Sequence, residues 1–305
     1  MSLDALQKIK NNPEKPLLCL EVNPPRGVNV EDVFNRLDGN VEGIDLFNVT
    51  DSALARMKAA GLPFASMLKQ RFGIEAAVNV SCRDRNLLAL QSDLLAGWTL
   101  GVRSVVALTG DAMTIGDSPD RKGVFEVNSI GLLNVIATLN SGKDLAGNDL
   151  NGAPSYFPGV VVNPNVRNPA AEIRRLTKKK EAGARYALSQ PVFDVEVSSN
   201  FFKAAQECGL PIMMGLLPWK TGKSALNMAK IPGIRLPDSL IAEVEKRGEG
   251  DISDFAIEHC LELARVNRSL VAGFHVVSGA TPKLGLRLVQ ELARRIAQGA
   301  FKAGA

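Results

Sequence analysis

Eight short apolar runs recur along the chain, and the spacing between them leaves room for a helix after each one. The runs are rich in Val, Ile, Leu and Phe, as expected of buried strands, and they span 17–22, 44–49, 75–81, 104–110, 157–163, 185–190, 211–217 and 272–278. Helical patterns lie between them, among others at 30–37, 85–100, 170–182, 198–208, 252–267 and 282–298. Strands that alternate with helices predict right-handed crossovers and a parallel sheet. Eight such units in 305 residues predict an α/β fold, a single (β/α)8 TIM barrel.

The organisation between these units is also informative. No linker rich in Pro, Ser or Gly divides the chain, so we expect residues 1–305 to form one catalytic barrel domain. Two polar stretches, 112–123 and 140–158, read as long loops on either side of one helix. Barrels keep functional insertions in such loops.

Charge and composition exclude several classes of partner. The net charge of +4 comes from 36 basic and 32 acidic residues spread along the chain, and only two Tyr and two Trp are present. A basic stripe and stacking aromatics are both missing, so we expect no nucleic-acid partner. No apolar run is long enough to span a bilayer, and the N-terminus lacks the pattern of a signal peptide. We therefore expect no membrane association, a cytoplasmic location and small-molecule substrates.

Cysteine and histidine usage argues against a metal centre. The four cysteines form no CxxC pair, and they stand at Cys19, Cys82, Cys208 and Cys260. Buried free thiols are the simpler interpretation. The only histidines are His259 and His275, so a histidine-based metal site is not expected. His259 falls within a helical pattern and is interpreted as structural.

Polar side chains cluster where the predicted strands end. In barrels the groups that carry chemistry emerge at the carboxyl ends of the strands, and here these ends carry Glu21, Thr50, Ser81, Arg83, Asp111, Asn163 and Gln190. Glu21 follows four apolar residues, so burial should raise its pKa toward the range in which a carboxylic acid acts near neutral pH. Alternatively, Glu21 and Asp111 merely cap the loops and helices that follow them.

Nucleotide-binding motifs are largely missing. No GxGxxG follows a strand, and the TGKS at 221–224 lacks the first glycine of a Walker A loop, because Leu217 stands there. We interpret TGKS as a loop-to-helix junction. The run TKKK at 177–180 is explained either by a solvated helix face or by contact of one lysine with a phosphate.

Taken together, the blocks LEVNPPRG, NVTDS, NVSCRDRN, LTGD, GVVVNPNVRN, KKKEAGARYALSQPVFD and GLLP make the chain similar to the methylenetetrahydrofolate reductase family, in particular to its bacterial one-carbon and acetogenic branch. The resemblance extends over nearly the whole chain and implies a (β/α)8 barrel. It implies reduction of 5,10-methylenetetrahydrofolate to 5-methyltetrahydrofolate, or the reverse oxidation, by ping-pong hydride transfer through FAD, with NADH or NADPH as co-substrate. The reduced folate and the nicotinamide nucleotide would be its partners, and self-association into a homo-oligomer is left open.

The resemblance also assigns roles to individual residues. Glu21 matches the catalytic acid that protonates the folate nitrogen, and Asp111 matches the acid beside the flavin ring and the pterin. Gln190 matches a substrate contact. Thr50 matches a contact of the flavin ring, whereas Glu172 and Lys179 match an acid and a lysine on the FAD ribose and phosphates. The remaining cofactor-binding positions that the resemblance implies are Asn79, Ser81, Arg83, Gly110 and Asn163.

Some positions depart from the family pattern. Histidine is frequent in the family where Asn79 and Asn163 stand, and the aromatic residue that stacks on substrate aligns with Gly222. Trp219 is the candidate to replace that stack.

Two alternatives remain open at this stage. One is a reductase that works without flavin or on another reduced pterin. The other is a non-catalytic folate-binding subunit of a methyltransferase complex. The presence of Glu21, Asp111 and Gln190 favours the enzyme.

Overall fold

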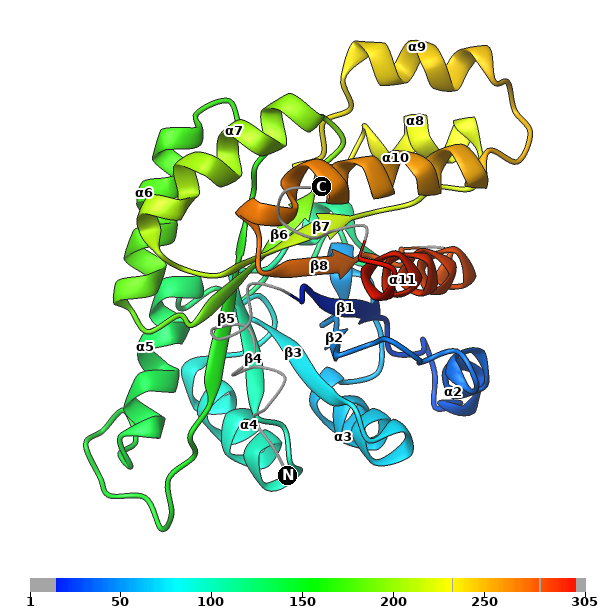
Figure 1. Cartoon of the computed structure of the whole chain (residues 1–305). Coiled ribbons are helices and arrows are strands. Elements are labelled where there is room, and N and C mark those ends of the chain that lie inside the picture. Colours follow the sequence, from blue (N-terminus) through cyan, green and yellow to red (C-terminus); the bar gives the residue numbers. More distant parts are fainter. Residues whose placement is uncertain (1–14, 232, 280, 300–305) are drawn as a thin grey trace.

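Eight parallel strands close into a barrel in chain order from β1 to β8 (Figure 1). This computed structural model describes residues 15–231, 233–279 and 281–299. The strands are β1 (Leu17–Val22), β2 (Leu46–Val49), β3 (Glu75–Ser81), β4 (Ser104–Leu108), β5 (Phe157–Val162), β6 (Tyr186–Pro191), β7 (Ile212–Leu216) and β8 (Gly273–Val276). Each lies in one of the eight predicted runs or within one residue of it, so the α/β barrel prediction is confirmed.

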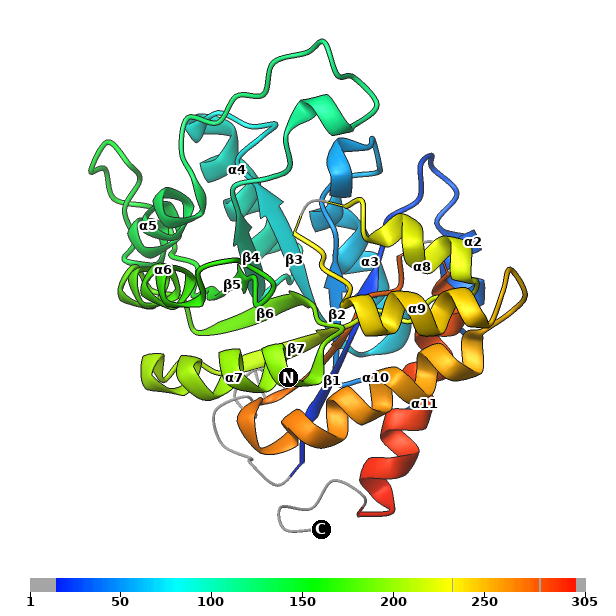
Figure 2. The same ribbon diagram turned by 90° about the horizontal axis from the view of Figure 1, so that it is seen from above.

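Helices surround the barrel and cover the outer face of the sheet (Figures 1 and 2). They are α2 (Glu31–Leu37), α3 (Gly61–Phe72), α4 (Leu87–Thr99), α5 (Ser129–Asn140), α6 (Pro169–Glu181), α7 (Val195–Ala205), α8 (Gly222–Met228), α9 (Asp238–Lys246), α10 (Ser253–Asn267) and α11 (Pro282–Ala297). The largest boundary error is at α7, which begins three residues before the predicted start at 198. Asp194 caps this helix, because its side chain accepts a hydrogen bond from the backbone N–H of Val197 at 2.9 Å. No helix in the described part of the chain has both the length and the apolar composition needed to cross a bilayer.

The barrel interior is filled by tiers of side chains. The strand register places every second residue inside, and alternate strands contribute to the same tier. The lower tiers are largely apolar, and their members include Leu46, Ser104, Tyr186, Cys19, Ala77 and Met213. The next tier upward consists of Asn48, Val106, Leu188 and His275, and the tier above it consists of Glu21, Asn79, Val161 and Gly215. The interior therefore becomes polar toward the carboxyl ends of the strands on the side of β8, β1, β2 and β3.

A second small core lies outside the barrel, where α8 and α9 lie beside α10 in both views (Figures 1 and 2). The chain between β7 and α10 folds back on itself here, and Thr221 starts α8 with a capping box to Ser224. TGKS is thus a loop-to-helix junction, as predicted. The buried members of this satellite core are Phe193, Leu217, Trp219, Ala225, Leu236, Leu240, Val244, Ile252 and Ala256.

Candidate active site

Glu21 is the central acid of the barrel mouth. It lies on the inner face of β1, partly exposed at the top of the interior. Burial raises the pKa of its carboxyl to about 7, against weaker opposing hydrogen bonds from the backbone of Gly279 and the side chain of Asn23. The Asn23 contact is long, with 3.5 Å between Nδ2 and Oε1. Near neutral pH a large share of Glu21 therefore carries a proton, as a general acid must.

Thr50 ties the end of β2 to the end of β1. Its hydroxyl donates to Asn23 Oδ1 at 2.9 Å, and the residue is only 1% exposed. Because Asn23 also contacts Glu21, the three side chains form one connected polar group. The structure thus brings together Thr50 and Glu21, which the resemblance assigned to different roles, a flavin contact and the catalytic acid.

Ser81, Arg83 and Gly110 also come together, at the ends of β3 and β4. The backbone N–H of Arg83 donates to Ser81 Oγ at 3.1 Å. Gly110 has φ +100°, and a Cβ at this position would lie 2.2 Å from Ser81 Oγ and 2.9 Å from Arg83 Cβ. Only glycine permits both this backbone conformation and this close approach. The glycine of LTGD therefore brings the β4 end tightly against β3.

Asp111 holds the segment that follows β2. Its Oδ2 accepts a hydrogen bond from the backbone N–H of Leu54 at 2.7 Å. Ser52, Leu54 and Ala55 all have left-handed backbones, with φ of 46°, 56° and 53°, and non-glycine residues adopt this conformation only under external restraint. Arg83 supplies a second restraint, because its Nη2 donates to the Ser52 carbonyl at 3.2 Å. Asp111 does act as a cap on a neighbouring loop, yet it remains exposed at the mouth.

Glu172 and Lys179 lie on the face of α6 that packs toward β5. Glu172 Oε1 accepts from the backbone N–H of Asn163 at 3.1 Å. Lys179 is 7% exposed, and its Nζ donates to the carbonyl of Val161 at 2.6 Å. Burial lowers the pKa of this lysine, and Glu172 partly opposes that effect. Lys179 is thus engaged with β5, whereas the exposed cations of this helix are Arg174, Arg175, Lys178 and Lys180.

Gln190 stands in an irregularity of β6. The register between β6 and β7 shifts between Leu188 and Pro191, and the N–H of Gly215 donates to Ser189 Oγ at 2.8 Å. A Cβ on Gly215 would lie 2.5 Å from the Ser189 carbonyl oxygen, so the shift depends on that glycine. Bulges of this kind re-aim a side chain, and Gln190 is left partly exposed.

Trp219 is not at the mouth. Its ring is 1% exposed and contacts the rings of Phe193, Phe255 and His259 at centroid distances of 5.9, 6.3 and 5.7 Å. The indole packs inside the satellite core, so neither face of the ring is free to stack on a substrate. This placement argues against the predicted substrate contact.

The sequence interpretation missed two residues of the interior. Asn48 and His275 face each other beneath the mouth, with 3.4 Å between Nδ2 and Nε2. His275 is 5% exposed, and burial lowers its pKa to about 4, so the imidazole is neutral. The available signal was the presence of a polar residue at an inward position of each apolar run, LFNV and FHVV.

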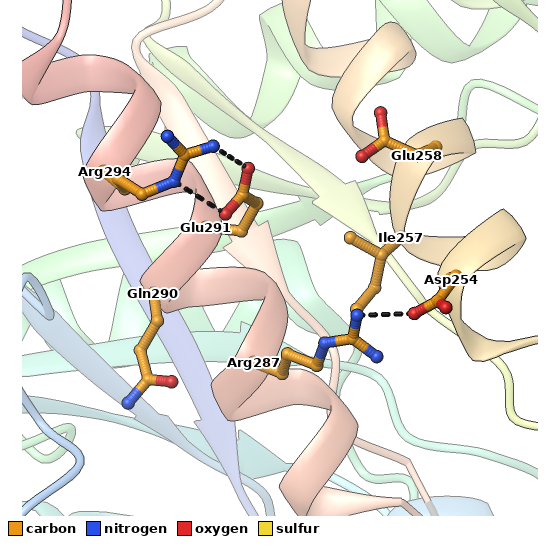
Figure 3. Close-up of a pocket in the computed structure, with 7 residues that line it drawn as sticks. All are labelled: Asp254, Ile257, Glu258, Arg287, Gln290, Glu291 and Arg294. Atoms are coloured by element: carbon orange, nitrogen blue, oxygen red, sulfur yellow. Dashed lines mark hydrogen bonds and ion pairs between the residues drawn. The ribbon is translucent and has the colours of Figure 1, made fainter.

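Two cavities lie away from the mouth. One, of about 430 Å³, is a groove between α10 and α11 whose charged side chains pair with one another, as Arg287 does with Asp254 and Arg294 with Glu291 (Figure 3). The other, of about 300 Å³, lies beside the start of β7 and is mainly apolar. Among the described residues, no three His, Cys, Asp or Glu side chains gather closely enough to hold a metal ion.

Comparison with known proteins gives a consistent family match. Residues 5–292 match the model of the methylenetetrahydrofolate reductase family. The 5,10-methylenetetrahydrofolate reductase of Salmonella typhimurium is 30% identical over 172 residues, which cover 56% of this chain and 53% of that protein. The probable methylenetetrahydrofolate reductase (NADPH) of Caenorhabditis elegans is 23% identical, covering 83% of this chain and 38% of the relative. Methylenetetrahydrofolate reductase (NADH) 1 of Arabidopsis thaliana is 24% identical, covering 86% and 46%. The matched part is thus about half of each relative or less.

Proposed function

Because the chain belongs to the methylenetetrahydrofolate reductase family, we propose that it interconverts 5,10-methylenetetrahydrofolate and 5-methyltetrahydrofolate, with NADH or NADPH as the hydride source. The observation that carries the proposal is Glu21, a carboxylic acid with a pKa of about 7 at the mouth of the barrel. Reduction of the one-carbon bridge consumes a proton, and an acid of this pKa can deliver it near neutral pH.

The residues around the mouth suit a flavin cofactor in two respects. The mouth offers amide and carboxyl groups from Gln190 and Asp111, which match the hydrogen-bonding edge of a flavin ring, whereas the Thr50 hydroxyl is buried and donates to Asn23. The exposed cations of α6 offer positive charge for a diphosphate, with Arg175 and Lys178 better placed than the buried Lys179. We therefore propose FAD as the cofactor. Bound FAD would carry the hydride between the nicotinamide and the folate.

Glu21 is the proposed proton donor. Its carboxyl faces the interior tier below and the mouth above, so a substrate nitrogen seated over β1 would lie within its reach. Protonation of that nitrogen weakens the methylene bridge and makes its carbon a better hydride acceptor. The same mouth has to accept the nicotinamide and the folate in turn, which supports a ping-pong order.

Asp111 and Gln190 are the proposed substrate-positioning groups. Asp111 is exposed and is fixed by its hydrogen bond to Leu54. It can accept hydrogen bonds from the amino and ring N–H groups of a pterin. Gln190, re-aimed by the irregularity of β6, can both donate and accept two strands further around the mouth.

The decisive experiment separates the two half-reactions. The purified protein is analysed for extracted FAD or FMN, reduced anaerobically with NADH or NADPH, and reoxidised with methylenetetrahydrofolate. In Glu21→Gln, cofactor reduction should persist while folate reduction falls by about 10²- to 10⁴-fold. Glu262→Gln, an exposed position on α10, is the matched control and should leave both rates unchanged.

Other outcomes would redirect the assignment. Folate reduction by a protein that neither retains nor takes up flavin would favour the flavin-independent reductase. Tight folate binding without reduction would favour the non-catalytic subunit. Equal losses in both half-reactions of Glu21→Gln would indicate a structural role for the acid.

A further inference from the structure

The strand register places Glu21 directly above a pair of polar side chains. Glu21 is opposite Asn48 in the pairing of β1 with β2, and His275 is opposite Cys19 in the pairing of β1 with β8. Asn48 and His275 therefore belong to one tier, flank β1 from both sides, and meet beneath Glu21. Asn79 on β3 belongs to the same tier as Glu21.

This polar group contains buried atoms without hydrogen-bond partners. Within the described residues, they are the carbonyl oxygens Asn48 Oδ1 and Asn79 Oδ1 and the ring nitrogen His275 Nδ1. Buried carbonyl oxygens are nearly always hydrogen-bonded, because an unpaired one costs about 1–3 kcal/mol. A carboxylate cannot satisfy them, since it only accepts hydrogen bonds, whereas a protonated carboxyl donates one.

The neighbouring imidazole fixes the orientation of one acceptor. Asn48 Nδ2 contacts His275 Nε2 at 3.4 Å. His275 is neutral near pH 7, because burial lowers its pKa to about 4. In the tautomer with its proton on Nδ1, His275 accepts at Nε2 from the amide NH₂ of Asn48 and leaves the Asn48 carbonyl oxygen for another donor.

We propose that Asn48 and Asn79 are positioning residues for Glu21: one of their carbonyl oxygens accepts the carboxyl O–H of Glu21 directly, or both accept from one buried water molecule that itself accepts this O–H, and His275 orients Asn48. The inference deepens the proposed function, because it explains how a barrel mouth keeps its acid protonated. It needs no cation and no second acid. Among the described residues, the groups that face Glu21 are Cys19 on β1, Asn48 and Thr50 from β2, Asn79 on β3, His275 and Ser278 from β8 and its loop, Asn23, and the backbone of Gly279. Of these groups, Cys19 and His275 titrate.

The test is a titration of Glu21 itself. Infrared difference spectra of the unmodified protein and Glu21→Gln isolate the C=O band of the protonated carboxyl, which is followed against pH without folate or nicotinamide. Asn48→Leu should lower the pKa of Glu21 by about one pH unit, a tenfold change in the protonation equilibrium. Asn79→Leu should act in the same direction, and His275→Phe should give a smaller downward shift.

The sign of the shift discriminates between explanations. If the asparagines served only as a polar environment, leucine would make the site more apolar and raise the pKa of a carboxyl. Ser104→Ala is the matched control, because this buried hydroxyl bonds to Phe157 and Tyr186 well below Glu21 and should not shift the pKa.

Asn79 is partly exposed, so Asn79→Leu gives a result even if Asn48→Leu fails to fold. Unchanged or raised pKa values in the folded variants would overturn the proposal. The titration needs no turnover, so a protein without reductase activity could still show the downward shift, and failure of the proposed function would be recognised separately.

Discussion

Replacing Glu21 with Gln should stabilise the protein, and by more at higher pH. The folded-state pKa is about 7, against an ordinary value of 4.5. Between these values the folded protein holds a proton that the unfolded chain has released, so stability falls as pH rises from about 4.5 to 7. The difference of about 2.5 pH units corresponds to roughly 3 kcal/mol. Gln carries no charge and removes this penalty.

The assay compares reversible urea unfolding of the unmodified protein and Glu21→Gln at pH 5, 6, 7 and 8. The stability advantage of the variant should be small at pH 5 and increase by about 2–3 kcal/mol at pH 8. Glu291→Gln is the control of opposite sign. Arg294 and Arg295 hold the pKa of Glu291 at about 2, so this carboxylate stays ionised and its removal should destabilise the protein by nearly the same amount from pH 6 to 8.

A difference between Glu21→Gln and the unmodified protein that stays constant from pH 5 to 8 would refute the reasoning. Glu21 would then be ionised in the folded state like an ordinary surface acid. Its proposed role as a proton donor near neutral pH would lose its physical basis.

Three further substitutions test the rest of the mouth. Gly110→Ala should destabilise the protein by about 2 kcal/mol or more, measured by urea unfolding, because φ is +100° and the new methyl would lie 2.2 Å from Ser81 Oγ; an unchanged midpoint would contradict the close approach. Asp111→Asn keeps an acceptor for the Leu54 N–H but removes a carboxylate. Spectroelectrochemistry of the flavin-loaded protein should then show the flavin midpoint potential raised by at most about 60 mV. A lowered potential would contradict this prediction. Trp219→Phe should lower the free energy of unfolding by about 1–3 kcal/mol without changing KM for the folate. A large rise in KM would instead indicate that Trp219 stacks on the substrate.

The architecture could be predicted from the sequence because strands buried on both faces are continuous apolar runs. Each of the eight runs became a strand, with ends set by local contacts. The run at 44–49 forms a regular strand only from Leu46. At Asp45 the backbone N–H still donates to the Leu18 carbonyl at 2.9 Å, but the backbone N–H of Leu18 donates to the Asp45 side chain at 2.9 Å. Such side-chain contacts depend on the tertiary structure and cannot be read from an apolar pattern.

The site was only partly predictable for a related reason. Acids and amides at strand ends are visible in the sequence, so Glu21 and Asp111 could be predicted as candidates. Trp219 was predicted to replace the stacking aromatic residue of the family, yet the satellite core, whose buried members span 63 positions from Phe193 to Ala256, determines where the indole lies. His275 was overlooked because its significance depends on which face of β8 is inside, and that follows from the register with β1 and β7.

Closure of the barrel fixes the register of these strands. Strand β1 is hydrogen-bonded on both edges, to β2 and to β8, so it cannot slip by one residue without breaking two ladders at once. Deletion of one residue within Leu17–Leu20 would exchange odd for even positions and present Val22 to the mouth in place of Glu21. Chain-length changes are therefore tolerable in the loops above the mouth and forbidden in the six residues below it, so insertions during divergence or engineering should accumulate only after the strands end.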